Sequence, residues 1–206
     1  DLKGGETVFD LYCGVGTIGL YCAQRAKYVW GIESVKSAVI DANRNAVING
    51  LVNIQFIHGK AEEKIVSLVE RARRQEAEQN GGKESEQRAA DIVIMDPPRA
   101  GCRPELLKAV MQAAPEKIIY VSCDPGTLMR DLKYLTGMKE FGSPVHDTAA
   151  GVAGSAAEVA SGAASQRSAE AQPDSVYKIE RIRQVDQFCH STHVETVVLM
   201  RKNTSI

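Results

Sequence analysis

The chain has 206 residues, of which 44% are hydrophobic and 25% are charged, and its formal net charge at pH 7 is −1. This length suffices for one domain with a sizeable core, and no apolar run reaches the roughly 18–20 residues that a membrane-spanning helix requires. The near-zero charge excludes an overall basic field for a nucleic acid, so that any contact with a polyanion depends on a local patch.

Apolar strands alternate with helices along most of the chain. Strands are predicted over residues 7–13, 28–34, 54–60, 90–101 (which ends in a loop) and 117–123, and helices over 17–26, 37–50, 61–79, 104–114 and 125–135. Unbroken apolar strands separated by helices predict a doubly wound, mostly parallel Rossmann-like α/β sheet that is covered on both faces. Residues 176–188 and 193–202 read as two strands with no helix between them, which predicts a C-terminal antiparallel hairpin.

Two segments depart from this alternation. Residues 74–90 are polar and charged, which predicts a helix end followed by a loop. Residues 143–175 are rich in Ala, Gly and Ser, so we expect a surface insertion there that buries little apolar area. We therefore expect a single catalytic domain over residues 1–206. Its five scattered cysteines form no CxxC pair, which favours a reducing cytoplasm and argues against a metal site in this chain.

The segment "DLYCGVGTIGL" carries the glycine spacing GxGxxG between a predicted strand and a predicted helix. Gly14 and Gly16 allow the backbone to turn tightly and to approach a ligand closely. Glu33 ends the next strand, where its carboxylate is placed to bind ribose hydroxyls. The pattern fits a dinucleotide or S-adenosylmethionine, and Asp10 before the turn favours S-adenosylmethionine.

The segment "IVIMDPPRAG" places Asp96 at the end of the fourth strand, where ligands bind in doubly wound sheets. Two consecutive prolines stiffen the loop that follows, and Arg99 projects from it. Asp96 then lies near the cofactor or the target, and Arg99 pairs with a phosphate or a carboxylate. The simpler interpretation is a turn with two charged surface residues.

Cys123 follows the fifth strand, in "VSCDPGTLMRDL". Asp124 fits the N-cap and Pro125 the first position of the next helix, and a helix N-terminus favours a thiolate over a thiol. A free cysteine is more often an inert core residue, so both interpretations stay open. Cys102 in the DPPRAG loop is a rival nucleophile, whereas packing explains Cys13 better.

Glu195 lies in "HSTHVETVVLM", and strand alternation puts it on one face with His193 and Val197. A carboxylate at this place is either exposed at the sheet edge or held there for proton transfer. The sequence alone favours the edge position.

These four segments, in this order, resemble the RNA uracil-5-methyltransferases, which form 5-methyluridine in ribosomal and transfer RNA. The resemblance covers roughly residues 1–138 and 176–202. It implies S-adenosyl-L-methionine as the cofactor and RNA as the partner, with ribosomal RNA favoured over transfer RNA. The target base is expected to leave its stack to reach the site.

The resemblance also implies roles for individual residues. Cys123 is the nucleophile that attacks uracil C6, and Glu195 is the base that removes the C5 proton. The family's cofactor contacts fall on Tyr12, Thr17, Glu33 and Asp96, and the glycine turn adds Gly14 and Gly16. Arg99, which projects from the DPPRAG loop, and His193 are expected to bind the substrate. One further cofactor contact of the family aligns near Lys60. Family members usually carry Asn or Asp at this position, so Lys60 departs from the family pattern. The N-terminal RNA-binding β-barrel of the family, often with an iron–sulfur cluster, is also missing from this chain.

Three rival functions remain. An amino-methyltransferase acting on adenine or cytosine uses an aromatic residue where this chain has Arg99, and it leaves Cys123 without a role. A nicotinamide-dependent oxidoreductase explains the glycine turn and Glu33 but neither later motif. A non-catalytic RNA-binding module is disfavoured by the net charge of −1.

Overall fold

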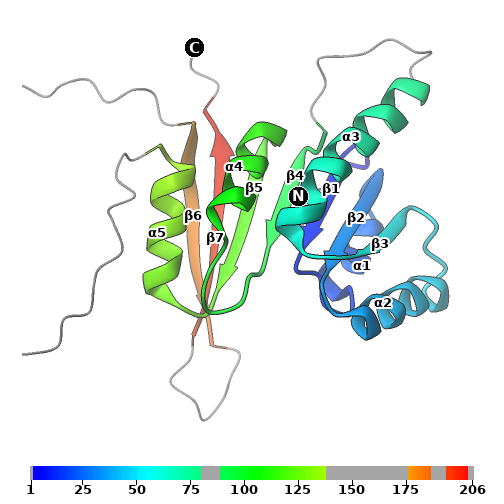
Figure 1. Ribbon diagram of the computed structural model, residues 1–206, viewed down its shortest axis with the longest axis horizontal. Coiled ribbons are helices and arrows are strands. Elements are labelled where there is room, and N and C mark those ends of the chain that lie inside the picture. The colour runs from blue at the N-terminus through cyan, green and yellow to red at the C-terminus, as the bar shows by residue number, and fades with distance from the viewer. Residues whose placement is uncertain (1, 80–88, 138–175, 187–193, 204–206) are drawn as a thin grey trace, which may run out of the picture.

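The computed structural model describes residues 2–79, 89–137, 176–186 and 194–203, which form one α/β sheet with its helices (Figure 1). The elements in chain order are β1 (Thr7–Leu11), α1 (Thr17–Ala23), β2 (Tyr28–Glu33), α2 (Lys36–Ile48), β3 (Ile54–His58), α3 (Ala61–Gln79), β4 (Ile92–Met95), α4 (Pro104–Ala113), β5 (Lys117–Ser122), α5 (Pro125–Leu135), β6 (Tyr177–Val185) and β7 (Glu195–Lys202).

The sheet has seven strands in the order β3-β2-β1-β4-β5-β7-β6. The pairs among β1 to β5 are parallel, whereas β7 runs antiparallel to both β5 and β6. The predicted doubly wound sheet and its C-terminal antiparallel strands are therefore confirmed. The chain winds outward from β1 to β3 and then returns to place β4 beside β1. In such sheets the crevice outside the carboxyl ends of these two central strands binds ligands.

Helices cover the sheet as two layers. The apolar faces of α3, α4 and α5 pack on one side, where Ile65, Leu107 and Leu135 are fully buried together with Phe9 of β1. On the other side, α1 and α2 pack against Val8 and its neighbours. An apolar stripe attaches α3 to this core, because Ile65, Leu68 and Ala72 are buried and Val69 packs against the same cluster. Apolar burial on both faces makes the sheet a rigid support for loops at its edge.

The predicted strands extend too far at their carboxyl ends. β1 stops at Leu11 because Tyr12 adopts a left-handed backbone, with φ of 64°. β4 covers only Ile92–Met95, and β5 ends one residue before Cys123. The residues beyond these ends form the loops of the candidate site. The expected insertion at 143–175 lies outside the described residues.

Candidate active site

The glycine turn joins β1 to α1 at the carboxyl edge of the sheet. Gly14 and Gly16 both have positive φ, of 54° and 86°, which confirms the expected need for glycine in this turn. A Cβ on Gly14 meets no atom within 4 Å, so its backbone faces open space that a ligand can approach. Thr17 is the first residue of α1. The turn thus presents exposed backbone beside a helix start.

Glu33 ends β2 directly beside this turn. Its Oε2 accepts a hydrogen bond from the Gly14 N–H at 3.0 Å, and its Oε1 accepts one from the Val35 N–H at 2.8 Å. These bonds fix the carboxylate against the glycine turn while its side chain stays partly exposed. A carboxylate fixed in this way can accept hydrogen bonds from the two hydroxyls of a ribose.

A cavity of about 570 Å³ adjoins the turn, between the start of α3 and the loop after β4. Its lining includes Tyr12, Ser34, Lys60, Cys102 and Arg130. The volume lies in the range of small-molecule sites. Of the predicted cofactor contacts only Tyr12 and the divergent Lys60 line this cavity.

Three carboxylates at this edge influence one another. Burial raises the pKa of Asp10 to about 7; the Gly19 N–H opposes this rise, and the charge of Asp96 adds to it. The pKa of Asp96 is also raised, first by loss of hydration at the sheet edge and then by the charge of Glu195. The Oδ2 atom of Asp10 is buried without a hydrogen-bond partner among the described residues. Such a group of carboxylates attracts a cation and repels a pyrophosphate.

Cys123 lies between β5 and α5, at the same edge. Asp124 is the N-cap of α5, as predicted, and its Oδ1 accepts a hydrogen bond from the Thr127 N–H at 2.8 Å. Pro125 takes the first helical position. The antiparallel register pairs Ser122 of β5 with Thr196 of β7. Cys123 is the first residue after β5 and Glu195 is the residue of β7 that precedes Thr196, so continuing the register brings these two to adjacent positions.

The other described cysteines are poor nucleophiles. Cys13 and Cys102 are only 8% and 3% exposed, whereas Cys123 is partly exposed. Burial raises the pKa of Cys102 to about 12, which keeps it a thiol near neutral pH. Burial also raises the pKa of Cys13. Accessibility therefore favours Cys123 among the described cysteines.

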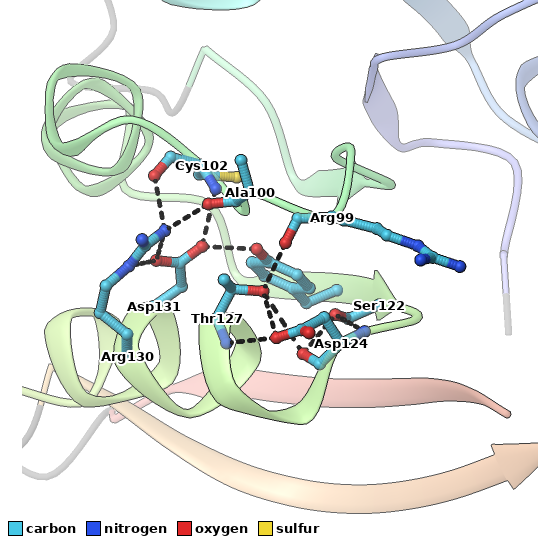
Figure 2. Close-up of polar contacts among 9 residues, drawn as sticks. Arg99, Ala100, Cys102, Ser122, Asp124, Thr127, Arg130 and Asp131 are labelled. Carbon is cyan, nitrogen blue, oxygen red and sulfur yellow. Dashed lines mark hydrogen bonds and ion pairs between the residues drawn. The ribbon is translucent and has the colours of Figure 1, made fainter. Parts of the chain in front are cut away.

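Two further residues, Arg99 and His193, were predicted to bind the substrate. Arg99 is exposed on the loop after Asp96, and Figure 2 shows its guanidinium extending away from Asp131. His193 lies outside the described residues. Arg130 and Asp131 were not among the predicted site residues, although both contact the loop after β4. The adjacent letters "RD" on a predicted helix gave no signal, because charged residues on helices usually face solvent.

Among the residues that the structure describes, no helix combines the length and the apolar character that a membrane span requires. No group of three or more His, Cys, Asp or Glu side chains in these ranges is placed to hold a metal ion.

The sheet order, the glycine turn and the carboxylates define a Rossmann-like methyltransferase. Residues 3–142 match the family described as tRNA (Uracil-5-)-methyltransferase. The chain therefore belongs to the tRNA (uracil-5-)-methyltransferase family, which confirms the resemblance seen in its motifs.

Relatives of the chain come from several bacteria. An uncharacterized RNA methyltransferase of Clostridium tetani is 38% identical over 200 residues, covering 97% of this chain and 32% of the relative. One of Caldanaerobacter subterraneus subsp. tengcongensis is 37% identical, covering 98% of this chain and 33% of the relative. The chain thus spans about a third of the length of the curated relatives it matches.

Solved structures agree with this assignment. The tRNA (uracil-54, C5)-methyltransferase of Pyrococcus abyssi, solved in complex with S-adenosyl-L-homocysteine, superposes with a TM-score of 0.61 at 29% identity. The superposition covers 97% of this chain and 35% of that one. An rRNA methylase of Streptococcus thermophilus superposes with a TM-score of 0.56 at 14% identity, covering 98% and 89% of the two chains, and supports the fold alone.

Proposed function

We propose that this chain is the catalytic part of an RNA methyltransferase that transfers a methyl group from S-adenosyl-L-methionine to C5 of a uridine. One observation carries the proposal: the β5–β7 register brings Cys123 and Glu195 to adjacent positions at the carboxyl edge. A partly exposed thiol beside a carboxylate supplies both the nucleophile and the base that C5 substitution needs. Membership of the family supports the same chemistry.

In this proposal, Cys123 activates the uracil ring of the substrate. Its thiolate Sγ forms a bond to C6 of the uracil ring, and the electron pair of the C5–C6 double bond becomes available at C5. Cys123 lies two residues before the start of α5 and is partly exposed, so its sulfur is accessible to a substrate. When S-adenosyl-L-methionine is bound, it supplies the methyl group as an electrophile.

Glu195 completes the substitution. Its carboxylate takes the proton from C5 of the covalent adduct, and the electron pair of that C–H bond re-forms the C5–C6 double bond. The Sγ–C6 bond breaks as this double bond forms, and its electron pair leaves with sulfur as the thiolate of Cys123. Glu195 is partly buried at the first position of β7, so it is held by the sheet rather than by a loop.

The carboxylates of the edge fit the proposed cofactor. S-adenosyl-L-methionine carries a sulfonium and an ammonium group, and Asp10 and Asp96 provide negative charge with one buried oxygen still unpaired among the described residues. Gly14, Gly16 and Thr17 would line the methionine end, and Glu33 would hold the ribose. Tyr12 borders the cavity on the other side of the turn.

RNA is the proposed partner, with Arg99 binding a phosphate close to the target base and His193 contacting the substrate from the segment before β7. We propose ribosomal RNA as the first candidate and transfer RNA as the second. One observation favours the second candidate, because the similar Pyrococcus abyssi enzyme is a tRNA methyltransferase. With either RNA, the target uridine is expected to leave its base stack to reach Cys123.

The rival activities have less support. An amino-methyltransferase has no role for the partly exposed Cys123, and the loop after Asp96 carries Arg99 in place of a stacking aromatic residue. A nicotinamide-dependent oxidoreductase would place an anionic pyrophosphate beside the carboxyls of Asp10 and Asp96. Burial is the main cause of their raised pKa values, and neighbouring negative charge raises them further.

The test is nucleoside analysis of methylated RNA. The chain is incubated with S-adenosyl-L-methionine and with ribosomal or transfer RNA lacking 5-methyluridine. Mass spectrometry of the digested RNA is expected to find 5-methyluridine. N6-methyladenosine or methylated cytidine instead would replace this proposal with the amino-methyltransferase.

A further inference from the structure

The loop after β4 is tied to the first turns of α5 by side chains that the proposed chemistry does not use. The Thr127 hydroxyl donates to the Arg99 carbonyl at 3.0 Å. Nη2 of Arg130 donates to two further loop carbonyls, those of Ala100 at 3.0 Å and Cys102 at 3.1 Å. Two side chains of α5 thus bind three carbonyl groups of the loop (Figure 2).

Asp131 completes this set from inside the protein. Its side chain is 0% exposed, and both of its oxygens are used. Oδ2 accepts hydrogen bonds from the Cys102 N–H at 2.8 Å and from the Tyr120 hydroxyl. Oδ1 accepts from Nε of Arg130 at 2.8 Å. A buried carboxylate with every oxygen satisfied fixes its partners firmly, because loss of one partner leaves a charge without compensation.

The loop is shaped to receive these side chains. Gly101 has φ of +74°, and a Cβ there would lie 2.5 Å from Nη2 of Arg130 and 2.7 Å from Oδ2 of Asp131. Only a residue without a side chain leaves room for both groups. The glycine of "DPPRAG" is therefore explained by the close approach of Arg130 and Asp131.

The two ends of this connection are the two halves of the candidate active site. The loop starts at Asp96, and α5 starts two residues after Cys123. We propose that Arg130 and Asp131 are positioning residues: their hydrogen bonds hold the loop against α5 and thereby set the place of Asp96 relative to Cys123. These two side chains are called the latch below. This inference rests on the proposed function for its effect on catalysis. The latch itself does not depend on it.

Asp131→Asn is the main test. The Asn side chain keeps an oxygen for the Cys102 N–H but turns an NH₂ group toward the Arg130 guanidinium, so the ion pair is lost with little change of shape. Arg130→Lys is the second variant, because an ammonium group lacks the planar fork by which Nε and Nη2 of Arg130 both contact Oδ1 of Asp131. Leu132→Ala, at a buried neighbouring position of α5, is the control that lowers stability without touching the latch.

Two properties of each latch variant are compared with those of Leu132→Ala, under conditions in which the variants have equal melting temperatures. The first is amide hydrogen exchange, and we expect the Cys102 amide to exchange faster in Asp131→Asn and in Arg130→Lys but not in Leu132→Ala. The second is catalysis, where a displaced loop is expected to lower kcat at least about tenfold more than in the control, with a smaller change in KM for S-adenosyl-L-methionine.

Unchanged exchange at Cys102 in both latch variants overturns the proposal, whatever the activity. A kcat loss equal to that of Leu132→Ala also overturns it, because the role is then structural only. If the wild-type protein forms no 5-methyluridine, the proposed function fails, and the exchange measurement alone decides on the latch.

Discussion

Cys123 and Glu195 occupy adjacent positions at the carboxyl edge of the sheet although 71 residues separate them in the chain. The pairing of Ser122 with Thr196 in the antiparallel β5–β7 ladder sets this relationship. A parallel neighbour in place of β7 would bring the far end of that strand to the edge. The reversal of one strand therefore lets a C-terminal residue join a site otherwise built from strand ends of the central sheet.

The first prediction concerns Glu195. Replacement Glu195→Gln keeps the shape of the side chain but removes its ability to accept the C5 proton. We expect kcat to fall by about 10²–10⁴-fold, the usual contribution of a general base. Because the Cys123–C6 bond forms before this step, a covalent protein–RNA adduct is expected to accumulate on denaturing gels.

Glu180→Gln is the matched control, since Glu180 lies on β6 and pairs with Arg201 far from the edge. Loss of activity in Glu195→Gln without an accumulated adduct would contradict the order of steps.

The second prediction concerns Glu33 and the choice of cofactor. Glu33→Gln removes the charge that accepts the ribose hydrogen bonds, so we expect affinity for S-adenosyl-L-homocysteine to fall by about 10–100-fold. Isothermal titration calorimetry measures this change, with Glu70→Gln on the exposed face of α3 as the control. Tighter binding of NAD than of S-adenosyl-L-homocysteine by the wild-type chain would favour the oxidoreductase instead.

The third prediction is a pH dependence of stability that arises at Asp10. The pKa of this carboxyl is raised from 3.8 to about 7 in the folded chain, mainly by burial. Unfolded chains then lose the proton at lower pH than folded ones, so the stability of the fold decreases from about pH 4 to about pH 7 and is level above that. The full penalty is on the order of 4 kcal/mol.

Asp10→Asn cannot ionise, so its free energy of unfolding is expected to lose this decrease with pH. Urea denaturation at a series of pH values measures it, and Asp41→Asn at an exposed position of α2 serves as the control. Equal pH slopes for Asp10→Asn and the wild type would show that Asp10 is ionised normally in the fold.

Sequence patterns predicted the elements of this fold well, and helices α3 and α5 agree with their predicted bounds at both ends. Their apolar spacing and the Asp-Pro start of α5 are local signals that packing does not override. The strand ends were predicted less well. Tyr12 looks like a strand residue by its aromatic side chain, but its left-handed backbone turns the chain away from the sheet.

The residues of the candidate site likewise include some that a local motif predicts and some that only the folded structure brings together. Gly14, Gly16 and Glu33 belong to a local motif and could be assigned from spacing. Asp131 could not, because its burial depends on a loop 29 residues earlier that folds over α5. The motif resemblance assigns the nucleophile to Cys123, and the structure adds a physical reason, since Cys102 is buried whereas Cys123 is partly exposed.

The fourth prediction uses thiol reactivity. In a Cys189→Ser background, which removes a cysteine outside the described residues, iodoacetamide at pH 8 is expected to modify Cys123 first. Cys22 and Cys102 are buried, and burial raises the pKa of their thiols to about 11 and about 12. Peptide mapping follows the reaction. Modification of Cys102 as fast as Cys123 would contradict the assignment of the nucleophile.

The most direct test of the central claim is covalent trapping with RNA that contains 5-fluorouridine. Fluorine at C5 cannot leave as a proton does, so the Cys123–C6 bond is expected to persist after methyl transfer. The protein is mixed with this RNA and S-adenosyl-L-methionine, and the adduct is mapped by mass spectrometry. The account predicts an adduct on Cys123 that is absent in Cys123→Ala; an adduct on Cys102, or no adduct on any cysteine, would contradict it.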